Sequence, residues 1–329
     1  MNIYDIAKEA GVSISTVSRV LNNKTNVRAD TRKKVELVLE KHNYAPSSIA
    51  RGLVSKSLDT VGILTIDIRV PHYAETAYIL ERELYKLGYN AILCNTGGKP
   101  ENGIDYITTL MQTGVRGIIL IGSVFQNKYI ETSLINSFSN VPFIVMNSQL
   151  HADNIYSVMF NQERGVALCL DHLAEKGHRD ILYVQDAETF SGANKASAFI
   201  KLSEERGVAD AASRLFKTSR GAVGGREVID RIIESGQSFT AIVFGDDLTA
   251  IGGMQRLHEL RFKIPDNVAI IGWNNTKSST LCVPYLTTVD NQNEMIGVIS
   301  VKLLENVLAG GKVSRNISID SSLIVRDST

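Results

Sequence analysis

From Val61 to Trp273, short apolar runs alternate with longer amphipathic stretches, and this alternation restricts the possible folds more than any other feature of the sequence. The apolar runs have the length of buried strands, and the stretches between them have the period of surface helices. Repeated strand–helix–strand units form parallel sheets that are covered by helices on both faces. Because the runs fall into two series, we predict two similar α/β subdomains.

The first series of strands is predicted at residues 61–66, 90–95, 117–122 and 142–147, and the second at 181–186, 241–246 and 268–273. Helices are predicted near 74–87, 101–112, 128–137, 163–176, 195–206, 223–235 and 248–260. Neither GxGxxG nor GxxxxGK[ST] occurs, so nothing supports a bound nucleotide. The three cysteines are far apart and match no metal-ligand spacing, and we expect no cofactor.

The first 22 residues follow a different pattern, that of two short helices joined by a tight turn. The apolar residues of the first helix have the spacing of one helical face. Gly11 is typical of a helix end, and the second helix is predicted to begin at Ser13 or Ser15. Such a pair forms a helix-turn-helix, whose second helix enters the major groove of DNA. From spacing alone, a solvent-facing helix pair in a larger bundle is an equally good interpretation.

Charge is unevenly distributed along a chain whose formal net charge is zero. Residues 1–58 hold ten lysines and arginines and five acids, whereas residues 59–329 hold 25 basic and 30 acidic residues. A basic end on an acidic body indicates a polyanion partner for that end alone. The alternative is a solubilising basic arm, but the apolar periodicity favours a folded unit. With no signal peptide pattern and no run of membrane-spanning length, we expect a cytoplasmic protein without a membrane partner.

The run YDIAKEAGVSISTVSRVLNN resembles the DNA-binding headpiece of the lactose/galactose repressor (LacI/GalR) family, and the similarity covers essentially the whole chain. It implies an all-α helix-turn-helix headpiece followed by an α/β effector domain of two similar parallel-sheet subdomains, as in periplasmic binding proteins. The expected parts are the headpiece at 1–45, a hinge helix or linker at 46–58 and the effector-binding and dimerisation domain at 59–329. Subdomain one is expected at about 59–158 and 290–319, and subdomain two at about 159–289 and 320–329.

The outward side of the second helix carries residues that can read a major groove. Arg19 can give two hydrogen bonds to guanine, and Ile14 can touch a thymine methyl group. By resemblance, residues 46–58 would become helical only on DNA, with Leu53 wedged between base steps; the alternative is a plain linker. The candidate DNA-binding residues are Tyr4, Ile14, Ser15, Thr16, Ser18, Arg19, Asn22, Ala50 and Leu53.

A third helix is predicted at about 30–42, with His42 packed inside the headpiece. At Arg28 the sequence departs from the family, which usually has a serine-like cap there. Arginine caps a helix poorly.

The resemblance places a ligand between the subdomains, where open α/β sheets bind ligands at the carboxyl ends of their strands. The motifs that carry over include VPHYAE, PFIVMNS, TFSGANKASAF, FGDDLTAIG and GWNNT. The candidate effector-binding residues are Asp67, Tyr73, Asn147, Ser191, Lys195, Arg220, Asp246, Trp273 and Asn274. Asn147 and Asn274 stand where the family commonly has Asp, and Asp246 replaces an Asn. Arg220 falls where an aromatic residue is frequent.

These departures favour a polar effector that is a sugar or a sugar derivative. Lys195 and Arg220 can face a phosphorylated or acidic sugar. The alternative is a neutral sugar with Arg220 pointing to solvent, and a purine-type effector stays open.

We therefore expect a transcriptional regulator, usually a repressor in this family, that binds a pseudo-palindromic double-stranded operator as a homodimer. A periplasmic sugar-binding protein would share residues 60–329 but needs a signal peptide in place of the basic headpiece. An enzyme needs a catalytic set, and the pair Asp246-Asp247 is better explained by helix capping.

Overall fold

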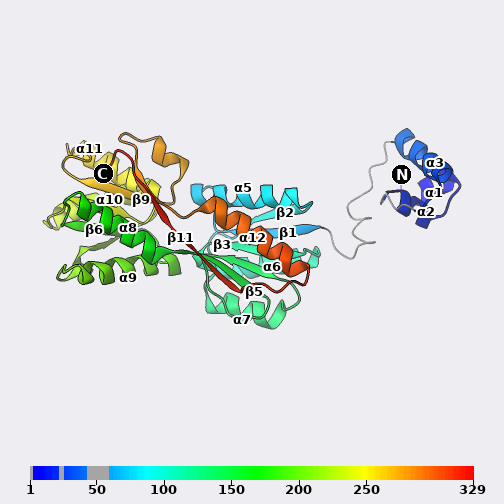
Figure 1. The fold of residues 1–329 in the computed structure, drawn as a ribbon, viewed down its shortest axis with the longest axis horizontal. Helices are drawn as coiled ribbons and strands as arrows, with labels where there is room; N and C mark the ends of the chain where they lie inside the picture. The colour runs from blue at the N-terminus through cyan, green and yellow to red at the C-terminus, as the bar shows by residue number, and fades with distance from the viewer. Residues whose placement is uncertain (1–2, 22–25, 43–58) are drawn as a thin grey trace. The chain divides into compact units, whose positions relative to one another are not determined.

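The structure is a computed structural model that describes residues 3–21, 26–42 and 59–329. It contains two compact units, Met1–Leu58 and Asp59–Thr329, which are described separately (Figure 1). Three predicted DNA contacts, Asn22, Ala50 and Leu53, lie outside the described residues, as does the predicted hinge.

The small unit is a three-helix headpiece with α1 (Ile3–Ala10), α2 (Ile14–Leu21) and α3 (Ala29–Lys41). One small apolar core joins the three helices, formed by Ile6, Ala7, Val17, Val20 and Val35. These positions follow the predicted helical period, so the predicted helix-turn-helix is confirmed.

Local signals set the helix ends of the headpiece. Gly11 has a φ of 67°, the left-handed conformation that commonly follows a helix. The Ser13 hydroxyl accepts a hydrogen bond of 3.3 Å from the amide of Thr16, which caps the start of α2. At the end of α3, His42 Nε2 lies 2.8 Å from Glu9 Oε2 of α1. His42 is exposed and joins α3 to α1 through this surface contact, so the prediction that it packs inside the headpiece is wrong.

The start of α3 lacks a good cap, because the side chain of Arg28 makes no capping hydrogen bond. We expect Arg28→Ser to stabilise this helix by about 1 kcal/mol. Amide hydrogen exchange in α3 of the full-length protein should then slow about fivefold. Lys33→Ser, in the exposed middle of the same helix, is the control because it cannot cap. Equal protection in the two variants would contradict the expectation.

The large unit contains two six-stranded sheets. The strands of the first are β1 (Thr60–Thr65), β2 (Asn90–Asn95), β3 (Gly117–Ile121), β4 (Phe143–Met146), β5 (Ile155–Asn161) and β11 (Asn316–Asp320). Those of the second are β6 (Ile181–Gln185), β7 (Leu215–Lys217), β8 (Ala241–Phe244), β9 (Ala269–Trp273), β10 (Thr287–Asp290) and β12 (Ser322–Ile324). We call the first sheet with its helices subdomain one and the second subdomain two.

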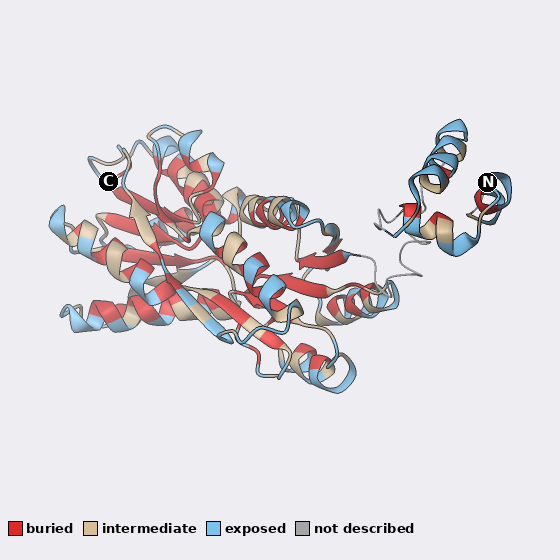
Figure 2. Ribbon diagram, turned by 45° about the vertical axis from the view of Figure 1, so that its right-hand side comes forward, coloured by how far each residue is buried: buried red, intermediate tan, exposed pale blue. Residues whose placement is uncertain are grey.

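Each sheet is covered on both faces by helices, as the alternation predicts. In subdomain one, α5 (Pro71–Lys86) and α12 (Asn293–Leu308) cover one face, and α6 (Pro100–Gln112) and α7 (Lys128–Ser137) cover the other. In subdomain two these places are taken by α8 (Gln162–Glu175) with α9 (Phe190–Glu205) and by α10 (Ala222–Glu234) with α11 (Asp247–Glu259). Short 3-10 helices are η1 (Ser123–Phe125), η2 (Ala211–Arg214) and η3 (Lys277–Thr280). Figure 2 shows buried residues along the strands and exposed ones on the outer sides of the helices.

The two sheets share one topology. The order is β11-β5-β4-β3-β1-β2 in the first sheet and β12-β10-β9-β8-β6-β7 in the second. The first sheet is parallel throughout, whereas in the second β12 runs antiparallel to β10, which departs from the predicted all-parallel arrangement. The chain changes sheet after β5, β10 and β11, so three connections join the subdomains. In each sheet the order reverses beside the first strand, and such a switch point leaves a crevice at the carboxyl ends.

None of the helices in the described ranges is both long and apolar enough to cross a bilayer.

Candidate ligand cavity and DNA-binding surface

A cavity lies between the two subdomains and is lined from both sides by residues that follow strands. Subdomain one contributes the ends of β3, β4 and β5, and subdomain two contributes the residues after β6, β8 and β9. Helices α5 and α9 add His72, Tyr73, Ser191 and Lys195 to the lining. The position agrees with the crevice expected from the strand order.

Seven of the nine predicted effector-binding residues line this cavity: Tyr73, Asn147, Ser191, Lys195, Arg220, Trp273 and Asn274. Asp246 lies directly behind the lining, where its Oδ2 accepts a hydrogen bond of 2.9 Å from Asn274 Nδ2. The sequence motifs therefore identified residues of one cavity that are up to 201 positions apart in the chain, from Tyr73 to Asn274.

Asp67 is the exception, because it does not line the cavity. Both of its carboxylate oxygens accept hydrogen bonds from the Arg69 guanidinium, the shorter being 2.6 Å. The amide of Ile68 is bound by Asn95 Oδ1, which fixes the loop after β1. This pairing with Arg69 holds the pKa of Asp67 at about 2, and the side chain lies outside the cavity lining.

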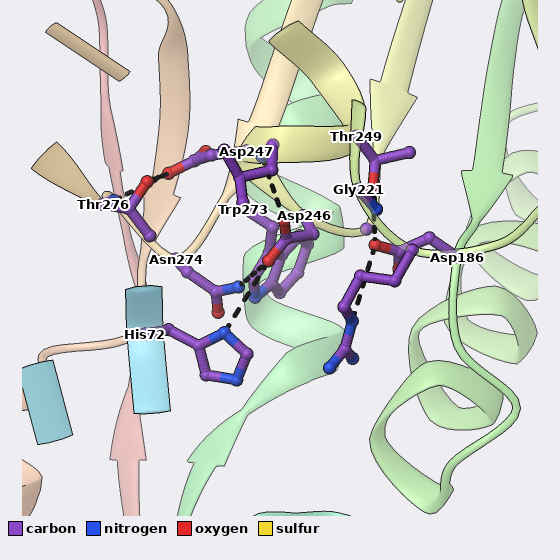
Figure 3. Close-up of polar contacts among 12 residues, drawn as sticks. His72, Asp186, Gly221, Asp246, Asp247, Thr249, Trp273, Asn274 and Thr276 are labelled. Carbon is purple, nitrogen blue, oxygen red and sulfur yellow. Dashed lines mark hydrogen bonds and ion pairs between the residues drawn. The ribbon is translucent and has the colours of Figure 1, made fainter. Parts of the chain in front are cut away.

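Asp246 links the start of α11 to the other subdomain (Figure 3). Its Oδ1 accepts the amide of Leu248, which confirms the predicted helix cap. Its Oδ2 lies 3.7 Å from His72 Nδ1, an atom that is buried and has no hydrogen-bond partner among the described residues. Burial, together with the charges of Arg220 and Lys195, lowers the pKa of His72 well below its usual value, so the imidazole is neutral at pH 7.

Arg220 enters the cavity from the start of α10 and faces Asp186. Its Nε lies 4.0 Å from Asp186 Oδ2, and its guanidinium carbon lies 6.0 Å from the centre of the Tyr73 ring. Asp186 Oδ2 accepts a hydrogen bond from the Thr249 hydroxyl, which in turn accepts one from the amide of Gly221 (Figure 3). This chain of bonds fixes the backbone beside Arg220. The alternative in which Arg220 points to solvent is therefore wrong.

Lys195 is buried against the single tryptophan. Its Nζ donates a 2.7 Å hydrogen bond to the carbonyl of Gly245 and lies 4.6 Å from the centre of the Trp273 ring. The indole Nε1 of Trp273 donates a 3.0 Å hydrogen bond to Asn291 Oδ1. The Trp273 ring is therefore fixed by Lys195 at its face and by Asn291 at its edge. Burial lowers the pKa of Lys195 to about 8, although Asp186 opposes this effect.

The charged side chains around the cavity balance one another. Lys195 and Arg220 are positive, and Asp186 and Asp246 are the two acids near them. Burial raises the pKa of Asp246, and the neighbouring Asp186 raises it further. The formal charges therefore cancel, and the cavity has no strong preference of its own for an ion of either sign.

Asp247 supports the site from behind. Its Oδ2 accepts hydrogen bonds from the amide and hydroxyl of Thr276, and its Oδ1 accepts one from the Thr288 hydroxyl. Burial raises its pKa to about 7, although these hydrogen bonds oppose the shift. The bonds hold the turn that carries Asn274, whose φ is 97°. Asp247 thus affects the cavity indirectly, by holding the turn that carries Asn274.

Three residues at the cavity were not among the predicted ones. His72 and Asn291 line it, and Asp186 lies beside Arg220 behind the lining. His72 stands in the quoted VPHYAE motif beside Tyr73. Asp186 ends the predicted strand ILYVQD in the same way that Asp246 follows AIVFG. The position after a strand was therefore a usable signal for Asp186.

The environment of Lys195 predicts a pH-dependent fluorescence signal. Below about pH 8, the charged ammonium group of Lys195 lies over the indole ring of Trp273. Above about pH 8, the amine of Lys195 is neutral. We expect the emission of Trp273 to change with a midpoint near pH 8, and Lys195→Met to abolish the change. Because the folded-state pKa is lowered from 10.5, the unfolded chain binds more protons between those values. The contribution of Lys195 to stability should accordingly rise with pH across that interval. An unchanged midpoint in Lys195→Met would assign the signal to another group.

In the headpiece, six of the predicted DNA contacts lie in the described parts of α1 and α2: Tyr4, Ile14, Ser15, Thr16, Ser18 and Arg19. Tyr4 is 67% exposed and Ile14 is 40% exposed, and Ser15 and Arg19 are also exposed. Thr16 and Ser18 are half-buried. The Ser13 hydroxyl lies 2.9 Å from the hydroxyls of both Ser15 and Thr16, so these groups form a local cluster at the start of α2.

A helix-turn-helix headpiece and a two-subdomain cavity together define a DNA-binding regulatory protein with a ligand domain. Residues 2–47 match the model described as bacterial regulatory proteins, lacI family, and residues 170–329 match the periplasmic binding protein-like domain. The chain is 31% identical to an HTH-type transcriptional regulator of Lachnoclostridium phytofermentans over 100% of this chain and 99% of that protein. This protein therefore belongs to the LacI family of transcriptional regulators.

Two further comparisons agree. The HTH-type transcriptional repressor PurR of Mannheimia succiniciproducens is 29% identical over 99% of this chain and 98% of that protein. The fold is similar to the crystal structure of the lac repressor dimer bound to operator and the anti-inducer ONPF, with a TM-score of 0.91 and 23% identity. That match covers 100% of this chain and 98% of the other.

Proposed function

We propose that this regulator is a repressor whose affinity for operator DNA is controlled by a neutral polyhydroxy effector, a sugar or a sugar derivative, bound between the subdomains. The observation that carries the proposal is the cavity at the carboxyl ends of both sheets, lined by polar residues of both subdomains. Similar proteins named as repressors, PurR and the lac repressor, support repression.

The contacts across the cavity connect ligand binding to the orientation of the subdomains. The cavity volume is about 60 Å³, well below the ~150 Å³ of an engineered cavity that holds benzene. A sugar therefore enters only when contacts across the cleft separate. They include Gln162 Nε2 to Asn147 Oδ1 at 2.8 Å and Lys277 Nζ to Glu75 Oε2 at 3.5 Å. An effector that shifts this orientation changes DNA affinity, and DNA changes effector affinity by the same factor.

The balance of charge favours a neutral effector over a phosphorylated or acidic one. An anion would leave one negative charge uncompensated in a buried site, which is costly. Hydroxyl groups instead both donate and accept hydrogen bonds. The carboxylates of Asp186 and Asp246 can accept from them, and the buried Nε of Arg220 can donate to them.

The same geometry supports the predicted effector-binding residues other than Asp67. We extend the set with His72 and Asp186, which face Asp246 and Arg220.

For the headpiece, we propose that α2 reads base edges with Arg19, Ile14 and Ser15, while Tyr4 contacts phosphate. Two headpieces of a homodimer would read the two halves of a pseudo-palindromic operator.

The edge of the first sheet is a suitable dimer surface. Strand β2 ends that sheet, and its Ile92 and Leu93 are 37% and 43% exposed. Tyr78 and Tyr85 on α5, which packs beside β2, are also exposed. Exposed apolar side chains at and beside an unpaired edge strand are typical of an interface.

Introducing a charge into this surface is expected to separate the dimer. Leu93→Glu should shift the protein from dimer to monomer in sedimentation velocity and weaken operator binding. Ile135→Glu, at an exposed isoleucine of α7, is the matched control and should stay dimeric. A dimeric Leu93→Glu protein would exclude this surface.

The experiment that tests the effector proposal uses the single tryptophan. Trp273 lines the cavity, so its fluorescence should report binding without a label. Purified protein is titrated with neutral sugars, sugar phosphates and sugar acids, and operator affinity is measured with each. We expect a saturable response to a neutral sugar together with a change in operator affinity. A response to the anionic ligands alone would contradict the proposed class.

A further inference from the structure

A second cavity lies in subdomain two, away from the effector cavity. Ile181, the first residue of β6, lines the second cavity, whereas Asp186, which faces the effector cavity, follows the last residue of the same strand. At about 3.3 Å per residue, the strand separates them by roughly 16 Å. The ends of α8 and α9 and the helix η2 form the remaining walls. The two cavities are therefore distinct sites.

Three arginines line the second cavity, and two of them are paired. Arg206 Nη2 donates to Asp171 Oδ1 at 2.6 Å, and Arg214 Nη2 donates to Asp180 Oδ1 at 2.9 Å. The other terminal nitrogen of Arg214 is buried and has no hydrogen-bond partner within the described ranges. Arg179 makes two 3.4 Å contacts with main-chain carbonyls and has no ion pair in the part of the chain that the structure describes. Donors therefore remain for an anion.

The net charge of the second cavity indicates how much negative charge a bound anion should carry. Three guanidinium groups and two aspartates leave one positive charge in excess, and the cavity lining contains no acid. Burial, with Lys176 nearby, lowers the pKa of His178, the remaining titratable group of the lining, so it is neutral at pH 7. A carboxylate supplies one negative charge, whereas a phosphate monoester carries about −1.5 to −2. The carboxylate is the better match.

The second cavity also has an apolar part of its lining. This part is formed by Leu170, Ala174, Ile181 and Val208. The cavity volume is about 220 Å³, and an engineered apolar cavity of ~150 Å³ is known to hold benzene. A ligand body of one ring, or of a branched chain of similar size, therefore fits beside the arginines.

We propose that the second cavity binds a small organic carboxylate with a compact apolar body. The carboxylate bonds to Arg179 and Arg214, whose planar forks suit a two-point contact with it. The apolar body packs against Leu170 and Val208. Helix α9 lines this cavity with Ser203 and the effector cavity with Ser191 and Lys195, and β6 runs from Ile181 of this cavity toward Asp186. The bound carboxylate therefore contacts elements that also position Lys195 and Asp186.

Benzoate is the first probe, since it combines one ring with one carboxylate. Full-length protein is titrated with benzoate, benzyl alcohol and inorganic phosphate, and binding is measured by ligand-observed saturation-transfer NMR. Benzyl alcohol keeps the ring without the charge, and phosphate keeps the charge without the ring. We expect saturable binding of benzoate and at least about tenfold weaker binding of the other two. Equal binding of benzyl alcohol, or no saturable binding of benzoate, would overturn the proposal.

Substitutions in the two cavities show which of them binds benzoate. Arg214→Met should weaken benzoate binding by about tenfold or more, because charged hydrogen bonds are lost. Ala174→Leu fills the cavity from α8 and should abolish binding, which keeps the test decisive if the arginine variant does not fold. Arg226→Met removes an arginine elsewhere in subdomain two and is the matched control. If Lys195→Met abolishes binding while Arg214→Met and Ala174→Leu preserve it, benzoate occupies the effector cavity and the proposal is wrong.

Discussion

Arg19→Ala is expected to remove most of the preference of this regulator for its operator over random DNA. Arg19 is exposed on α2, between the core residues Val17 and Val20, so its guanidinium can reach base edges without disturbing the headpiece core. A two-point arginine contact with guanine discriminates by about 1–3 kcal/mol. A dimer uses two copies, so the expected loss is about 2–6 kcal/mol, or roughly 30-fold to 10⁴-fold.

The measurement compares affinities for the operator and for a scrambled duplex at several salt concentrations. Lys33→Ala is the matched control, because it removes one exposed positive charge of the same headpiece from α3. Both variants should weaken binding to random DNA and lower the salt dependence similarly. The ratio of operator to random affinity should fall only for Arg19→Ala. A parallel fall for both duplexes would show that Arg19 contacts phosphate alone.

The elements of this fold were predictable because their periodicity is local. The strand GIILI of β3 is buried along its whole length, as a continuous apolar run in a parallel sheet predicts. Helix α9 begins at Phe190, five residues before the predicted start. The cause is a cap, because Thr189 Oγ1 accepts the amide of Gly192. Strand β7 was missed because it is a three-residue edge strand without a clear period.

The candidate site was predictable to the extent that strand ends were. Tyr73, Trp273 and Asn274 lie in motifs that follow strands, and all three line the cavity. What the sequence could not supply is pairing across the subdomains. The approach of His72 to Asp246 depends on how two separately built sheets face each other. The charge of the cavity also could not be judged from Lys195 and Arg220 alone, because only packing within subdomain two brings Asp186 close to them.

Asp246→Asn is expected to change which effectors are bound. Asparagine caps helices as well as aspartate does, so α11 should keep its start. Its single side-chain oxygen stays with the amide of Leu248, so the hydrogen bond that Asn274 Nδ2 donates to Asp246 Oδ2 is lost. The main consequence is electrostatic, because Lys195 and Arg220 then face a single acid, Asp186. At an effective dielectric constant of about 20, one unit charge about 5 Å away contributes roughly 3 kcal/mol.

We therefore expect Asp246→Asn to raise the affinity for a sugar phosphate relative to its parent sugar about 100-fold, measured by Trp273 fluorescence. The neutral sugar should bind more weakly than to the unaltered protein, since a carboxylate acceptor is lost. The matched control is Asp230→Asn, which removes an acid of α10 that pairs with Arg256 of α11. This variant should leave the effector selectivity unchanged. If the unaltered protein already prefers the phosphate, the charges of Lys195 and Arg220 are not balanced as inferred. If the variant keeps the original selectivity, Asp246 is uncharged in the folded protein, and its raised pKa then accounts for the result.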